Sequence, residues 1–83
     1  MNNFKGTPAP WTRNSADTVF SEDMVMVCEV NAESYDKRNA NAHLISAAPN
    51  LLEACQLLLD DPNELVFRLK AQAAINKALN TNP

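Results

Sequence analysis

Glycine is almost absent from this sequence, with one residue in 83. This excludes phosphate-binding loops and dinucleotide fingerprints, which need glycines where the backbone approaches a phosphate. Cys28, Cys55 and the single His43 are too few for a structural zinc site, so we expect no metal and no cofactor. No apolar run reaches the roughly 18 residues of a membrane span, and no signal-peptide pattern opens the chain. We therefore expect no membrane contact and a cytoplasmic location.

Positive charge is also scarce and dispersed. The net charge is −3, and the seven basic residues are scattered from Lys5 to Lys77 instead of gathering on one face. Nucleic-acid binders concentrate lysine and arginine, so we expect no nucleic-acid partner. Hydrophobic residues make up 46% of the chain and charged residues 20%, a balance that favours a packed core over disorder. The length allows a single small domain, residues 1–83.

Strand formers dominate the first part of the chain. Residues 1–17 contain Pro8, Pro10 and Trp11, which predict an extended arm whose tryptophan docks on the core. Residues 18–30 predict a β-hairpin with strands at 18–20 and 24–30. The second strand is apolar on both faces, which indicates a central or doubly covered position.

Alanine and leucine dominate residues 36–80, which we predict to be helical. A first helix is expected at 36–48, and at 100° per residue it places Asn41 within its apolar arc, where a buried amide needs a hydrogen-bond partner. Pro49 either kinks one long helix or begins a second, and we favour a second helix over 49–60.

A last helix is expected at about 62–80, and residues 81–83 should fray. Asp61, followed by Pro62, is typical of an N-cap. The predicted fold is α+β, with a short antiparallel hairpin or small sheet packed against two or three helices.

The last helix carries two apolar stripes. Leu65, Leu69 and Ala73 follow one side, and the other is lined by Phe67, Ala71, Ala74 and Ala78. One chain of this length has little material to cover both, so we predict a homo-oligomer that uses the alanine-rich stripe. In the alternative, the hairpin and the preceding helix cover the two stripes within a monomer.

No catalytic constellation stands out. His43 and Ser46 lie close on one helix, but no glycine elbow or oxyanion-hole loop accompanies them, so we expect no enzymatic activity. The candidate contacts to a ligand or partner are Trp11, Arg38, Asn41 and His43. Three of them also have a structural interpretation: Trp11 as cover for the core, Asn41 as a backbone anchor, and His43 as a residue that faces solvent or an interface.

Two segments resemble a known group of proteins. They are Thr7-Pro8-Ala9-Pro10-Trp11 and Asn39-Ala40-Asn41-Ala42-His43-Leu44-Ile45-Ser46-Ala47-Ala48-Pro49-Asn50-Leu51-Leu52-Glu53-Ala54. The sequence is similar to small phage and prophage proteins with a Thr-Pro-Gly-Pro-Trp start and an Asn-Ala-Arg-Leu-Ile-Ala-Ala-Ala-Pro-Glu-Leu-Leu-Glu-Ala-Leu segment. Ala9, His43 and Cys55 depart from that pattern, where the group has glycine, arginine and leucine.

The resemblance implies a phage or prophage origin and action in the bacterial host cytoplasm, and it implies no particular chemistry. The leading hypothesis is a non-enzymatic accessory protein that self-associates and acts through protein–protein contacts, including contacts with a host protein. The alternative is an oligomer that binds or sequesters a nucleotide-like ligand through Trp11, Arg38, Asn41 and His43 at a subunit junction.

Overall fold

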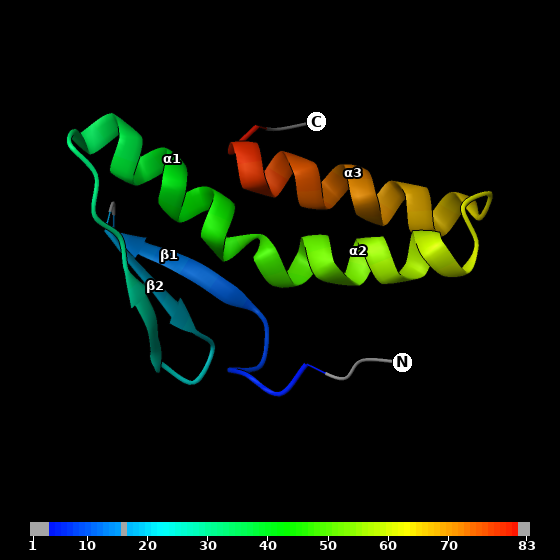
Figure 1. The fold of residues 1–83 in the computed structure, drawn as a ribbon, viewed down its shortest axis with the longest axis horizontal. Helices are drawn as coiled ribbons and strands as arrows, with labels where there is room; N and C mark the ends of the chain where they lie inside the picture. Colours follow the sequence, from blue (N-terminus) through cyan, green and yellow to red (C-terminus); the bar gives the residue numbers. More distant parts are fainter. Residues whose placement is uncertain (1–3, 16, 82–83) are drawn as a thin grey trace.

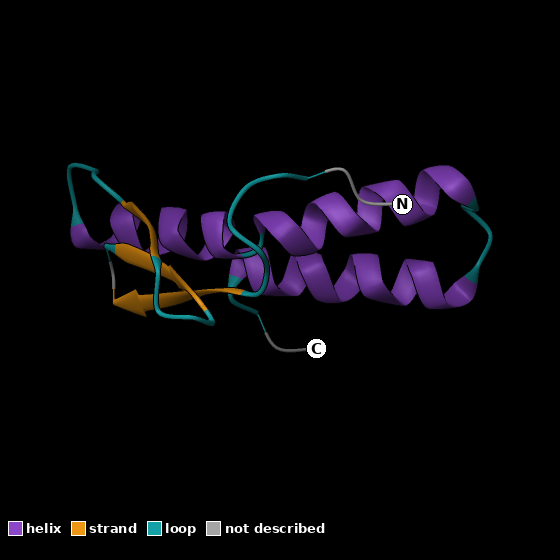
Figure 2. Cartoon of the chain, turned by 90° about the horizontal axis from the view of Figure 1, so that it is seen from below, coloured by secondary structure: helices purple, strands orange, loops and turns teal. Residues whose placement is uncertain are grey.

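The fold combines a small sheet with three helices, as predicted for an α+β domain (Figure 1). The computed structural model describes residues 4–15 and 17–81. The elements are β1 (Trp11–Ser15), β2 (Thr18–Ser21), β3 (Met26–Glu29), α1 (Tyr35–Ser46), α2 (Ala48–Asp60) and α3 (Leu65–Leu79). The sheet packs at one end of the helical layer, beside α1 (Figure 2).

The sheet has three antiparallel strands in the order β1-β2-β3. β1 lies in the segment that we predicted as an extended arm, so the sheet gains a strand beyond the predicted hairpin. The prediction that the second hairpin strand is central or covered on both faces is wrong: β2 is central, and β3 is an edge strand whose first and last residues are exposed. Because β3 is an edge strand, its apolar residue Met26 is exposed, whereas Val19 of the central strand β2 is fully buried.

The turn between β2 and β3 is built on Ser21. Its carbonyl accepts the Met24 N–H at 3.0 Å, and its side-chain oxygen accepts the Val25 N–H at 3.2 Å. Met24 has a φ of 67°, in the left-handed region that glycine usually occupies. The turn contains no glycine, and the hydrogen bonds of Ser21 hold it instead. Strand β3 begins only at Met26.

α1 packs on one face of the sheet through Ala42, with Ile45 beside it. Ser34 caps the helix by accepting the Lys37 N–H at 3.2 Å. Ala42 and Ser46 are buried, whereas Asn41 and Leu44 are exposed. The prediction that Asn41 lies in the buried arc is therefore wrong. The small side chain of Ala42 lets the helix approach the sheet closely.

Pro49 separates two helices, as favoured from the sequence. Ala47 ends α1, with its N–H bonded to the carbonyls of His43 and Leu44, and it is also the N-cap of α2. Pro49 occupies the first turn of α2, where its missing N–H breaks no helical bond.

α3 begins three residues later than its sequence signal indicates. The Asp61 side chain accepts the Asn63 N–H at 3.1 Å in a turn before the helix, and Glu64 is the N-cap. The predicted start near Pro62 is therefore wrong, because the Asp61 bond closes a turn between helices. Asn80 ends the helix in the left-handed conformation. Residues 82 and 83 of the predicted frayed tail lie outside the described residues, as do residues 1–3 and 16 of the predicted arm.

The core is small. Val19, Val30 and Ala42 form its centre between the sheet and α1, and Trp11, Val27, Cys28 and Ile45 pack around them. Between the helices the buried residues are Ala54, Ala74 and Ala78. Among the described residues, Val19 is the largest side chain that is fully buried. Alanine permits close helix packing but buries little apolar area, so the interior contributes modest hydrophobic stabilisation.

The chain exposes more surface than a monomer of its mass should. It exposes 5820 Å², whereas a monomeric protein of this size is expected to expose about 4,900 Å². Its radius of gyration is 13.5 Å, compared with about 12 Å for a compact domain of this length. The extents of 40 × 28 × 18 Å describe a flat, elongated body.

Candidate functional site

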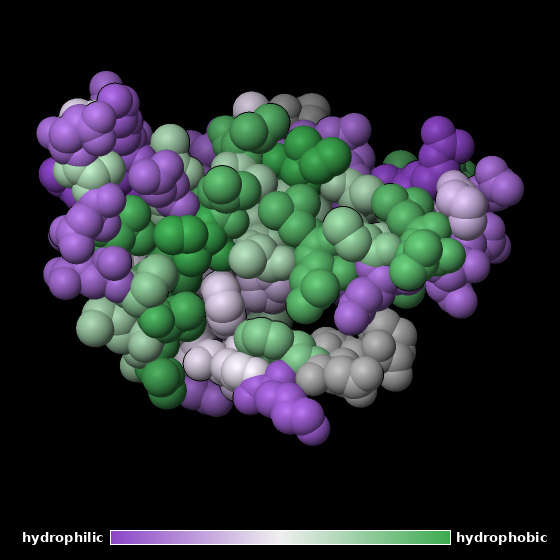
Figure 3. All heavy atoms as spheres, viewed as in Figure 1, coloured by the Kyte–Doolittle hydropathy of each residue, from purple (hydrophilic) through white to green (hydrophobic). Residues whose placement is uncertain are grey.

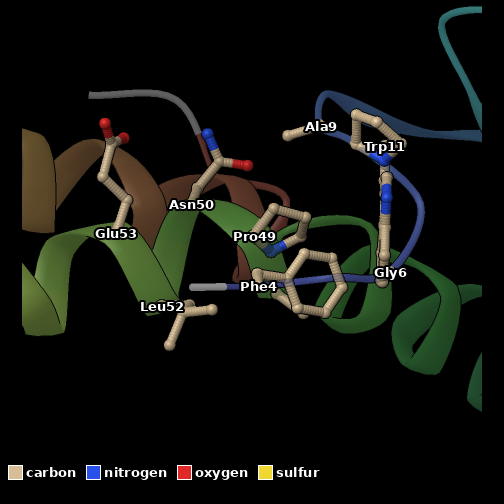
Figure 4. Close-up of a pocket in the computed structure, with 10 residues that line it drawn as sticks. Phe4, Gly6, Ala9, Trp11, Pro49, Asn50, Leu52 and Glu53 are labelled. Carbon is tan, nitrogen blue, oxygen red and sulfur yellow. The ribbon is translucent and has the colours of Figure 1, made fainter. Parts of the chain in front are cut away.

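A pocket of about 460 Å³ lies between the N-terminal arm and the first turns of α2 (Figure 4). Its walls are mostly apolar, and its lining residues are Phe4, Gly6, Pro8, Ala9, Trp11, Ala48, Pro49, Asn50, Leu52 and Glu53. The volume lies within the range of roughly 300 to 1,000 Å³ that is typical of ligand pockets. Neither side of the pocket is complete alone, since the arm supplies one wall and α2 the other.

Two aromatic rings form the arm side. Phe4 and Trp11 meet edge to face, with ring centroids 6.3 Å apart and planes at 63°. The Trp11 indole N–H donates to the Thr7 carbonyl at 3.0 Å. Because its polar atom is satisfied within the arm, Trp11 offers the pocket an apolar ring surface. It also packs on the core, as predicted.

Lys77 of α3 links the two sides of the pocket through hydrogen bonds. Its ammonium donates to the Trp11 carbonyl and to Asn50 Oδ1, both at 3.0 Å. One side chain of α3 thereby fixes the start of β1 and the start of α2. Burial lowers the pKa of Lys77 from its ordinary value.

The α2 side supplies the polar groups of the pocket. Asn50 and Glu53 project next to each other from the same side of the helix (Figure 4). The side-chain oxygen of Asn50 accepts a hydrogen bond from Lys77. The Glu53 carboxylate lies 3.9 Å from Lys70 Nζ in a half-exposed ion pair. The described lining residues include no arginine, lysine or histidine, so among them the charge of Glu53 has no counter-charge.

The four predicted contact residues do not come together. Trp11 lines the pocket described above, whereas Asn41 and His43 line a shallow depression at the end of α3, with Leu44 and Leu79. Arg38 is directed elsewhere and donates from Nη1 to the Ala32 carbonyl at 3.2 Å.

The pKa of His43 is lowered in the folded chain. Burial, and secondarily the positive charge of Arg13, lower the pKa of His43 from its ordinary value. Both causes disfavour the imidazolium in the folded chain, whereas the unfolded chain protonates at the ordinary pKa.

We therefore expect stability to fall as the pH is lowered from about 7 towards 5, where the unfolded state binds more protons at this site. His43→Gln should flatten the dependence of the free energy of unfolding on pH, measured by urea denaturation. Arg13→Gln should raise the pKa of His43 in an NMR titration only part of the way, because burial is the larger cause. An unchanged pH dependence in His43→Gln would contradict this account.

Sequence reasoning missed Phe4, Asn50, Glu53 and Lys77. Asn50 and Glu53 lie in the segment that carries the resemblance, but nothing in their spacing says that an arm closes over them. Lys77 gave a weak signal, as a lysine between the two apolar stripes of a helix. Its partners are far away in sequence, so only the folded chain shows them.

Within residues 4–15 and 17–81, no group of three or more histidine, cysteine or acidic side chains could hold a metal ion. None of the helices in this part of the chain is both long and apolar enough to span a membrane. The part of the pocket lining that the structure describes contains no serine, cysteine or histidine that could act as a nucleophile or base.

The chain is thus a small α+β domain with a ligand-sized pocket between its N-terminal arm and the first turns of α2. The chain belongs to the family described as Salmonella phage P22 protein Y8K6, whose family model matches residues 1–82. This confirms the phage origin that the resemblance implied. Neither the curated proteins nor the solved structures yield a match to the chain.

Proposed function

We propose that this chain is a non-enzymatic phage accessory protein that self-associates and acts through protein–protein contacts in the bacterial host cytoplasm. The observation that carries the proposal is the excess surface. The chain exposes 5820 Å², about 900 Å² more than expected for its mass. Standard protein–protein interfaces bury about 800 Å² per partner. The excess therefore matches what one interface would cover.

The exposed apolar surface is concentrated on the helices. Space-filling spheres show apolar side chains gathered over α2 and α3 on one face (Figure 3). The large exposed apolar residues of the helices are Tyr35, Leu44, Leu52, Leu59, Leu65, Val66, Leu69, Ile75 and Leu79. Surfaces of this kind typically mark interaction sites.

One group of these residues joins two helices. Leu44 of α1 and Leu79 of α3 line the same depression and are 53% and 67% exposed. Ile75 lies one helical turn before Leu79 and is 44% exposed. We call these three residues the α1–α3 cluster and assign the contact between copies to it.

The alanine-rich stripe faces inward. Ala74 and Ala78 are buried within a single chain, and Phe67 and Ala71 are half-buried. α1 and α2 are the helices that pack on α3. Ala74 and Ala78 are only 3% and 8% exposed, so they offer a second copy little surface. The proposed contact therefore relies on the exposed side chains of the α1–α3 cluster.

Thermal melting at increasing protein concentration tests the proposal. A chain that is stabilised by a second copy melts at a higher temperature as its concentration rises. We expect this rise in the natural sequence. The double variant Leu44→Glu/Leu79→Glu should melt at a temperature independent of concentration, because carboxylates in the cluster oppose its burial.

The matched control is Met24→Glu/Val25→Glu, which adds the same two charges at exposed positions of the hairpin turn. It should keep the concentration dependence. A melting temperature of the natural sequence that does not change with concentration would overturn the proposal. If the control also lost its concentration dependence, the contact would lie on the sheet and not on the α1–α3 cluster.

A second candidate function is the binding of a small ligand, which the pocket at Trp11 favours. A nucleotide-like ligand lacks support in this pocket, since phosphate needs positive charge or several N–H donors and Glu53 would repel it. Thermal-shift screening with nucleotides tests this candidate. Stabilisation by any of them would support it, and a flat response would count against it.

A further inference from the structure

We propose that the pocket between the arm and α2 binds an extended peptide segment of a partner protein, with an apolar ring against Trp11 and the backbone C=O and N–H of one peptide residue on Asn50 and Glu53. The inference rests on the proposed function only in taking a protein as the source of the ligand. It concerns a surface separate from the α1–α3 cluster, so the two can fail independently.

The pocket lining fits the side chains of such a segment. The rings of Phe4 and Trp11 face a wall that includes Pro49 and Leu52, so flat apolar groups can lie between the arm and α2 (Figure 4). Aromatic-lined grooves of this kind receive proline and other apolar residues of extended peptides, whose preformed conformation loses little entropy on binding.

The polar atoms of the pocket match the C=O and the N–H of one residue in an extended peptide. Asn50 accepts from Lys77 through its oxygen, and no hydrogen bond within the described residues involves its Nδ2, which leaves two N–H donors. Glu53 offers carboxylate oxygens one turn further along the helix. A peptide C=O can accept from Asn50 Nδ2 while the neighbouring N–H donates to Glu53.

The charge around the pocket excludes the other simple ligand classes. Lys70 lies near Glu53, the single carboxylate of the described lining, and the ammonium of Lys77 bonds Asn50. These positive charges offset the carboxylate, so the pocket does not attract a cation. An anion meets Glu53 and, among the lining residues that the structure describes, no cation. A neutral ligand with one donor and one acceptor fits both groups.

Fluorescence of Trp11, the sole tryptophan of the chain, provides the test. The probe is the non-fluorescent peptide acetyl-Pro-Leu-Pro-Pro-amide, titrated into the full chain. We expect a saturable change in emission. A copy of the peptide with an N-methylated leucine should bind more weakly, because it cannot donate to Glu53. Adenosine monophosphate should not compete.

Asn50→Asp is the sharpest variant, because aspartate can still accept from Lys77 while it lacks the Nδ2 donors. It should keep the fold, monitored by circular dichroism, and weaken peptide binding by about tenfold, the loss expected for one or two hydrogen bonds. Asp60→Asn, an exposed change of one group on the same helix, should bind as the natural sequence does.

Three results would overturn the inference: no saturable emission change at millimolar peptide, equal affinity for the N-methylated peptide, or full affinity in Asn50→Asp. If Asn50→Asp does not fold, the ¹⁵N resonances of the Asn50 side-chain amide in the natural chain decide. They should shift on peptide addition, and unshifted resonances would contradict the assignment. Sedimentation of the same samples reports self-association separately, so failure here leaves that proposal standing.

Discussion

Replacing Ala74 with glutamate is expected to unfold the chain. Ala74 is 3% exposed in the interior of the helical layer, so the new carboxylate has neither room nor a partner there. Burying an unpaired charge is among the few changes that cost about 4 kcal/mol or more, against a total stability of roughly 4 to 12 kcal/mol for a chain of this length. Circular dichroism and a urea titration measure the loss.

Ala73→Glu is the matched control, because Ala73 precedes Ala74 on the same helix and is exposed. The two variants have the same composition and helix propensity, and only burial differs. Ala73→Glu should retain the natural unfolding midpoint. A folded Ala74→Glu chain that merely loses self-association would show instead that the alanine-rich stripe is a surface between copies.

Lys77→Met should produce the second largest loss. Methionine keeps much of the side-chain volume but removes the donor that serves the Trp11 carbonyl and Asn50 Oδ1. Hydrogen bonds from a charged group contribute about 1.5 to 3 kcal/mol, and their removal leaves partly buried acceptors unpaired. We expect a loss of about 2 kcal/mol in the free energy of unfolding, together with altered Trp11 emission.

Lys70→Met provides the comparison. Lys70 pairs with Glu53 at 3.9 Å, and both side chains are about half exposed, so the pair should contribute less than about 0.5 kcal/mol. Equal losses in the two variants would mean that the hydrogen bonds of Lys77 do not hold the arm against α2.

The elements of the fold could largely be predicted because their signals are local. Pro49 separates α1 from α2 through chemistry confined to one turn of the chain. The start of α3 was misplaced because the Asp61 bond that resembles an N-cap closes a turn before the helix. β1 was missed because its pairing with β2, and not its own composition, makes it a strand.

The faces of the helices were harder to predict than the helices themselves. α1 has apolar residues around much of its circumference, so periodicity could not show that Ala42 and Ser46 are buried while Leu44 and Asn41 are exposed. The pocket could not be predicted at all, since it depends on an arm that folds back beside α2. Its central tie joins Lys77 to Trp11 across 66 residues of sequence.

The exposed apolar surface links these observations. An interior built largely on alanine leaves the larger leucine and isoleucine side chains outside, and the family membership shows a phage protein without supplying a partner. Self-association through the α1–α3 cluster would cover part of that surface and leave the pocket beside the arm open to a peptide.

Sedimentation equilibrium of the natural sequence at micromolar concentration tests the central claim most directly. The account predicts a mass of at least twice the 9.1 kDa of one chain, falling towards the monomer in the Leu44→Glu/Leu79→Glu variant. A mass of 9.1 kDa for the natural sequence across the whole concentration range would contradict it.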